Sequence, residues 1–141
     1  MIKNETGLKE IEKFVKEKLS CYDTRDLKLY MRWSTGKHKI NGYCRYTDFF
    51  TTCRVNKNNK YPIRFKYPVG TNQAGAGLSG FSWIIDESTA HDAEEAMAWI
   101  VGHETWHFLC KTKQEKGNFQ TKANKAGFAW MREFKERRNK I

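Results

Sequence analysis

The spacing of apolar residues constrains the fold of this chain more than any other feature of its sequence. Over residues 7–20 they recur every three or four positions, which predicts an amphipathic helix with Thr6 as its cap. Over residues 27–86 apolar and polar residues alternate, as in half-buried strands, and over residues 92–138 the helical spacing returns. This order of elements predicts an α+β fold.

A single domain is expected because 141 residues can build one core but are too few for two ordinary domains. It should consist of an N-terminal helix within residues 1–25, a strand-rich half over 27–86 and a helical half over 92–138. No apolar run approaches the roughly 20 residues that cross a bilayer, and the N-terminus lacks the apolar stretch of a signal peptide. We therefore expect a cytoplasmic protein without membrane contact.

The strand-rich half should form a sheet of three to five strands, antiparallel or mixed. The alternating segments are residues 27–33, 63–67 and 81–86, together with residues 43–55, which could be one bent strand or two short ones. Turns are expected at Gly36 and at the pair Asn41-Gly42. We expect the N-terminal helix to cover one face of this sheet.

The second helical region should begin at a capping box formed by Asp92 and Glu95. A charged break follows at residues 111–116, and the pair Gly117-Asn118 predicts a turn into a C-terminal helix. The first of these two helices carries the sequence His-Glu-Thr-Trp-His at residues 103–107. This motif indicates a specific chemistry.

His103 and His107 lie four residues apart, so a helix places both imidazoles where they can bind one metal ion. Two histidines at this spacing, with a glutamate after the first, are typical of zinc metallopeptidases. Glu104 lies about 100° around the helix from His103 and can serve as the general base for a zinc-activated water. The motif predicts hydrolysis of peptide bonds in a polypeptide substrate, with Zn²⁺ as the cofactor.

A catalytic zinc normally has three protein ligands, and the motif supplies two. No histidine follows His107, and Cys110 lies about 10 Å along the helix from His103, too far to share one ion. The third ligand is left open by the residues alone. The candidates are residues of the N-terminal half and the polar residues Glu115, Gln120, Asn124 and Glu133.

In these features the chain resembles the small zincins, particularly the SprT-like (Spartan-type) peptidases and the minimal gluzincins. The resemblance covers about residues 27–138. It rests on RWSTGKHKINGYCRY, WIID, IVGHETWHFL and GNFQTKANKAGFAWMREF, in that order along the chain. It implies a small zincin-like domain in which the motif helix and the C-terminal helix enclose the active site.

The resemblance also implies a third ligand. Gluzincin-like relatives carry on the final helix a zinc-binding Glu and, four residues later, an Asp or Asn that supports a ligand His. The matching positions here are Gln120, which by the resemblance would bind the metal through its amide oxygen, and Asn124, which would hydrogen-bond to a ligand His without touching the metal. SprT-like relatives use a His just after a Gly, whereas here Asn118 follows Gly117. Because a neutral amide binds zinc less well than a carboxylate, the alternative is a catalytically weak or inactive zincin-fold module that binds nucleic acid or a protein.

The net charge of +10 is unevenly distributed along the chain. Residues 1–66 carry 16 basic and 7 acidic side chains, residues 67–110 carry none and 6, and residues 111–141 carry 10 and 3. The basic flanks could attract nucleic acid, and the SprT-like resemblance suggests DNA-bound proteins as substrates. The alternative is a solvated lysine-rich surface, because the lysines are not interleaved with aromatic residues along the sequence.

One further motif is rejected. Residues 75–80 match the GxGxxG pattern of dinucleotide-binding proteins, but a strand and not a helix is expected to follow, so no helix N-terminus can hold a pyrophosphate. We expect this segment to be a loop, either a plain surface loop or one that leads into a strand bordering the active site.

Overall fold

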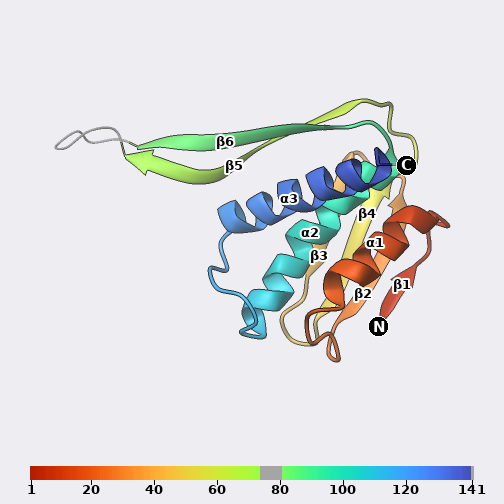
Figure 1. Cartoon of the computed structure of the whole chain (residues 1–141), viewed down its shortest axis with the longest axis horizontal. Helices are drawn as coiled ribbons and strands as arrows, with labels where there is room; N and C mark the ends of the chain where they lie inside the picture. The colour runs from red at the N-terminus through yellow and green to blue at the C-terminus, as the bar shows by residue number, and fades with distance from the viewer. Residues whose placement is uncertain (74–80, 141) are drawn as a thin grey trace.

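The computed structural model describes residues 1–73 and 81–140 of the chain. It contains, in chain order, β1 (Ile2–Asn4), α1 (Lys9–Leu19), β2 (Lys28–Ser34), β3 (Ile40–Cys44), β4 (Phe50–Asn56), β5 (Ile63–Gln73), β6 (Phe81–Ala90), α2 (Ala93–Lys111) and α3 (Gln120–Arg138). Figure 1 shows the helices gathered beside one sheet, with a long hairpin above them. The predicted α+β fold, with an N-terminal and a C-terminal helix, is confirmed.

Four strands form the larger sheet, in the order β1-β2-β4-β3. β1, β2 and β4 run parallel, whereas β3 runs antiparallel to β4 and forms an edge. The sheet is therefore mixed, one of the two arrangements expected. The segment over residues 43–55 divides between two strands, β3 and β4, rather than forming one bent strand.

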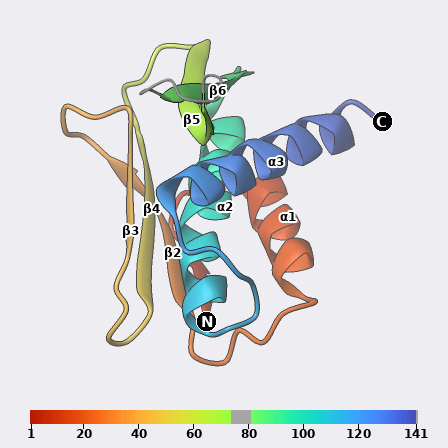
Figure 2. The same ribbon diagram turned by 90° about the vertical axis from the view of Figure 1, so that its left-hand side faces the viewer.

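The helices lie on one side of this sheet, and Figure 2 shows α1 and α2 against it with α3 crossing over α2. Period-two alternation in the strands explains which side chains meet the helices. In β2 Leu29 and Met31 are fully buried, and in β4 Cys53, the register partner of Met31, and Val55 are fully buried on the same side of the sheet. The residues between them point to the other side of the sheet, which no described helix covers.

β5 and β6 form a separate two-stranded antiparallel sheet. Both strands are longer than the segments predicted from the sequence, and the register shifts between Pro68 and Gly70. A proline lacks the N–H that a strand ladder requires, so an irregularity is expected there. The hairpin packs along α3 and extends beyond it (Figure 1).

α2 is buried on most of its circumference because the sheet lies on one side of it and α3 on the other. Two glycine–tryptophan contacts bring α2 and α3 close together. A Cβ atom on Gly102 would lie 2.7 Å from Trp130, and one on Gly127 would lie 2.8 Å from Trp99. Each helix thus provides a glycine for the other helix's tryptophan. Among the described residues, no helix combines the length and the apolar character that a membrane span requires.

Local signals at the start of elements were only partly correct. α1 has no side-chain cap from Thr6; instead, the Ile11 N–H donates to Oε2 of Glu94, 2.9 Å away on α2. Asp92 caps α2 as predicted, accepting from the Glu95 N–H at 3.0 Å. β1 was not predicted, and Gly42 lies within β3 and not in a turn.

Candidate metal and catalytic site

α2 places the two motif histidines side by side, with the ring centroids of His103 and His107 5.2 Å apart and their planes at 73°. Two imidazoles bound to one zinc at tetrahedral angles have ring centres about 5 Å apart, because each zinc–nitrogen bond is about 2.1 Å long. The observed separation fits one shared ion. The prediction that both histidines face the same site is therefore compatible with their geometry.

The His107 ring is held from its Nδ1 side. Nδ1 lies 2.6 Å from Oδ1 of Asn118 and 3.3 Å from the Tyr46 hydroxyl. The Asn118 Nδ2 donates to the same hydroxyl at 3.2 Å, which leaves its Oδ1 to accept from the imidazole. Nδ1 then carries the proton and Nε2 keeps its lone pair, the state that a metal ligand requires.

Sequence patterns alone do not predict this role for Asn118 or Tyr46. The resemblance to SprT-like peptidases places Asn118 at the position of a ligand His, which does not predict a hydrogen bond to His107. Tyr46 follows β3, far from the motif in the chain, and reaches the site only because β3 packs beside α2. A polar residue in the short connection after the motif helix is the local signal that could have drawn attention to Asn118.

His103 is enclosed by aromatic and amide side chains. Its ring stacks on Trp99, with centroids 5.1 Å apart and planes 21° from parallel. Burial, then the neighbouring His107, lowers its pKa to about 4, against smaller opposing contributions from Asn124 and Gln120. Its Nδ1 is buried without a hydrogen-bond partner among the described residues. A metal ligand must be a neutral imidazole, so a buried His103 that stays neutral suits metal binding better than a role as a proton carrier.

Glu104 is a buried carboxylate with few polar neighbours. The residue is only 7% exposed, and its Oε1 lies 3.6 Å from Nε2 of His103. Burial raises its pKa to about 7. A carboxyl group that exchanges its proton near neutral pH can act first as a base and then as an acid. The role predicted for Glu104 is thus chemically available in this environment.

β3 approaches Glu104 closely because residue 42 is a glycine. A Cβ atom on Gly42 would lie 3.0 Å from Cγ of Glu104 and 3.0 Å from the Thr52 carbonyl oxygen. A side chain there would force its neighbours, Glu104 among them, to shift by a few tenths of an ångström. The glycine therefore allows this close contact. The pair Asn41-Gly42 predicted a turn, and that prediction was wrong.

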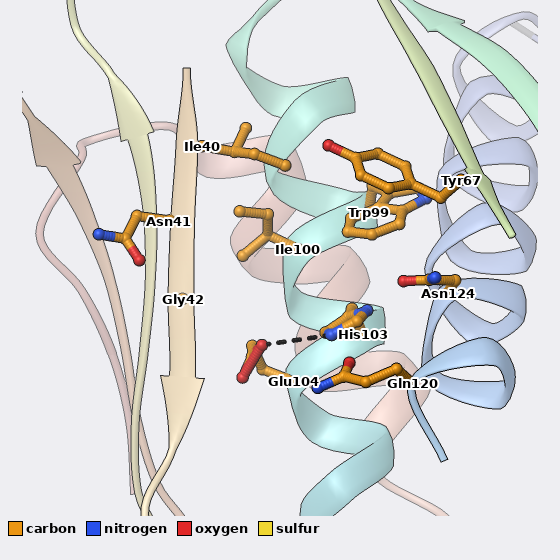
Figure 3. A pocket seen from close by; sticks show the side chains of 10 residues that line it. All are labelled: Ile40, Asn41, Gly42, Tyr67, Trp99, Ile100, His103, Glu104, Gln120 and Asn124. Carbon is orange, nitrogen blue, oxygen red and sulfur yellow. Dashed lines mark ion pairs between the residues drawn. The ribbon is translucent and has the colours of Figure 1, made fainter. Parts of the chain in front are cut away.

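A cavity of about 340 Å³ opens between β3, β5, α2 and α3 (Figure 3). It brings together four of the five predicted site residues. These are His103, Glu104, Gln120 and Asn124. The fifth, His107, lies one turn further along α2 and is not part of the cavity lining. The cavity lies beside β3 and β5, so the strand that borders it is not the one predicted over residues 81–86.

Asn124 links α3 to the hairpin. Its Nδ2 donates to the Pro68 carbonyl oxygen at 2.8 Å, and Figure 3 shows its amide oxygen directed toward His103. This hydrogen bond fixes the orientation of the carboxamide. The position is compatible with the supporting role that the resemblance implies for Asn124.

The candidates for the third ligand lie in different parts of the fold. Glu115 accepts from the Tyr22 hydroxyl at 2.9 Å, and Glu133 pairs with Lys18 at 2.6 Å, so both carboxylates are engaged elsewhere. Within the described residues, no three His, Cys, Asp or Glu side chains are grouped so that they could hold a metal ion. Gln120 lies at the cavity next to His103 and Glu104 (Figure 3). Two imidazoles and its amide oxygen are the donor set that these residues provide.

Compared with protein-family models, with curated proteins and with solved structures, the chain matches none of them. The GxGxxG segment at 75–80 lies outside the described residues. What the site can do therefore has to follow from its own side chains.

Proposed function

We propose that this protein is a zinc-dependent metallopeptidase of the zincin type, with a polypeptide substrate. The observation that carries the proposal is the position of Glu104. It is a buried carboxylate 3.6 Å from His103, whose ring lies at a distance from that of His107 that suits one shared zinc ion, and it lines a cavity bordered by β3. His103 and His107 would hold the ion through nitrogen, and Gln120 would complete the donor set through its amide oxygen.

The residues of the chain divide the reaction between them. Zinc, when bound, would polarise the scissile carbonyl and lower the pKa of the attacking water. Glu104 would take one proton from this water as its oxygen bonds to the carbonyl carbon. It would then return the proton to the nitrogen as the C–N bond breaks, giving a carboxylic acid and an amine. Asn118 and Asn124 would keep the two imidazoles in place.

β3 supports a polypeptide as the substrate. It is the edge of its sheet, so its outer backbone groups are not paired within the sheet. An extended peptide can add to such an edge through main-chain hydrogen bonds. Gly42 of β3 contacts Glu104, so a peptide on this edge would pass close to the proposed base.

A second function, a zincin-fold module with little or no catalysis, is favoured by one observation. Among the described residues, no three His, Cys, Asp or Glu side chains are grouped so that they could hold a metal ion. An amide oxygen is a weaker zinc ligand than a carboxylate, so the ion would be held less tightly. In this case the chain would act by binding a protein or a nucleic acid.

Cleavage of an unfolded protein tests the first function against the second. Zinc-supplied wild-type protein is incubated with fluorescently labelled casein, next to Glu104→Gln and a matched control, Glu136→Gln. Glu136 is exposed on α3. We expect Glu104→Gln to lose at least about 100-fold in rate while folding normally, and Glu136→Gln to match the wild type. Equal activity in Glu104→Gln would contradict the assigned base, and no cleavage by the wild type would favour the binding module.

A further inference from the structure

The side of the four-stranded sheet that faces away from α1 and α2, which we call the outer face, carries aromatic and basic side chains. These are Tyr30 and Arg32 on β2, Phe50 and Arg54 on β4, Tyr43 on β3, and the flanking residues Lys3, Lys28 and Arg45. The register explains why they share a face, since Lys28 is paired with Phe50, Tyr30 with Thr52, and Tyr43 with Thr52. No described helix lies over this side of the sheet (Figure 2).

Three rings form a continuous row on the outer face. The centroids of Tyr30 and Phe50 are 5.0 Å apart, and those of Phe50 and Tyr43 are 6.2 Å apart, with tilted planes in both cases. Guanidinium groups lie on two of these rings, Arg32 at 4.3 Å from the Tyr30 centroid and Arg45 at 5.0 Å from that of Phe50. Aromatic rings and cations that are separate in the sequence are therefore interleaved in space.

The outer face also has an excess of positive charge. Arg32 pairs with Glu5 at 2.5 Å, and Arg45 pairs with Asp48 at 2.7 Å. The remaining cations of the face, Lys3, Lys28 and Arg54, form no ion pair with a described carboxylate. They are spread over three neighbouring strands, β1, β2 and β4. Such a surface attracts a ligand that carries several negative charges along its length.

We propose that the outer face binds single-stranded nucleic acid. Single strands combine a phosphate at every nucleotide with unpaired bases, which stack on aromatic rings and on guanidinium planes. A duplex keeps its bases stacked inside, so it could use the cations of the face but not its rings. Stacking accepts every base, so the rings predict binding of single strands of any sequence.

This site lies on the opposite side of the sheet from Glu104. The carboxylate contacts β3 from the helix side, where Gly42 faces α2, whereas Tyr43 is exposed on the other side. Nucleic acid on the outer face would leave the cavity accessible. The proposal is independent of zinc binding and of peptidase activity.

Fluorescence anisotropy tests the proposal. The labelled probes are single-stranded DNA, single-stranded RNA and a DNA duplex, each about 12 nucleotides long per strand, and all are measured in EDTA. We expect both single strands to bind more tightly than the duplex. Three unpaired cations predict a slope of about −2 for log affinity against log salt, since each phosphate contact of a single strand contributes about −0.7. A preference between the two single strands would identify which nucleic acid the face prefers.

Tyr43 provides the sharpest variant because it is 45% exposed and its replacement leaves the core intact. Loss of one stacking contact in Tyr43→Leu should raise Kd at least about 5-fold, whereas Tyr43→Phe should keep the wild-type value. Lys28→Ala should make the salt slope shallower by about 0.7. The control is Lys125→Ala, at an exposed lysine on α3, which should leave the slope unchanged.

Two results would overturn the proposal. The first is unchanged affinity in a triple variant that carries Tyr43→Leu, Lys28→Ala and Arg54→Ala and that circular dichroism shows to be folded. This result would mean that nucleic acid does not bind to the outer face. Equal affinity for duplex, or for heparin, would show that only charge is recognised and that the rings have no role.

Discussion

Trp99 stacks on His103, one turn apart on α2, and the same indole lies close to α3 at Gly127, where a Cβ atom would be 2.8 Å from its ring. A change in the distance between α2 and α3 would therefore move the indole and, with it, the ring of the proposed metal ligand His103. The absence of a side chain at residue 127 sets how close α3 can come. Packing between the helices and the orientation of the His103 ring are thus coupled.

Gly127→Ala tests this coupling. In an unobstructed helix the change would stabilise the protein by about 1 kcal/mol, because alanine is the better helix former. Here the new Cβ would lie 2.8 Å from the Trp99 ring, so we expect a loss of about 1–3 kcal/mol in the free energy of unfolding. Urea unfolding measures it. Gly36→Ala, where nothing lies within 4 Å of the new Cβ, should leave the midpoint nearly unchanged. A more stable Gly127→Ala protein would refute the close contact.

Gly42→Ala should affect catalysis more than stability. Its Cβ would meet Cγ of Glu104 at 3.0 Å, which displaces the proposed base from the cavity wall. We expect kcat/KM to fall about 10-fold or more, because small displacements of a catalytic group are costly. Gly70→Ala is the matched control on β5, where the nearest atom is 3.7 Å away. Equal activities of the two variants would show that the position of Glu104 does not depend on Gly42.

Asn118→Ala should weaken zinc binding without removing a ligand. The change leaves Nδ1 of His107 without the acceptor that it now has at 2.6 Å, and losing such a partner typically costs 10- to 100-fold in metal affinity. Competition with a coloured chelator measures the affinity. Asn118→Asp keeps an acceptor and should retain most of it. If Asn118→Ala binds zinc as tightly as Asn58→Ala, an exposed control, Asn118 has no role in the site.

The elements of this fold were largely predictable, whereas the contacts between them were not. Periodicity is a local property, so it located α1, β2, α2 and α3 and the spacing of His103 and His107. The role of Gly42 depends on a helix 60 residues away, and the cap of α1 comes from Glu94. The rings of the outer face come from three strands, so no segment of the sequence displays their interleaving.

Acid should weaken the link between β6 and α3. The hydrogen bonds from Arg132 lower the pKa of Asp86 below its usual 3.8. The unfolded chain therefore takes up this proton at a higher pH than the native protein does. The stabilisation is complete above about pH 4 and is lost as the pH falls through the lower native pKa.

Asp86→Asn tests this linkage. At pH 7 it should reduce the free energy of unfolding by up to about 1 kcal/mol, the range of exposed ion pairs, and the difference from wild type should shrink at pH 3 or below. Urea midpoints at both pH values measure it. Asp26→Asn, at an exposed aspartate without an ion pair among the described residues, should show no difference at either pH. A constant deficit for Asp86→Asn would mean that charge is not its cause.

Zinc content tests the central claim most directly. Protein purified without chelators or metal-affinity resin is supplied with zinc, dialysed and analysed by mass spectrometry, with His38→Ala as a control at an exposed histidine. We predict about one zinc per chain in the wild type and in His38→Ala, none in His103→Ala or His107→Ala, and a reduced content in Gln120→Ala. No zinc in the wild type, or equal zinc in His103→Ala, would contradict the account.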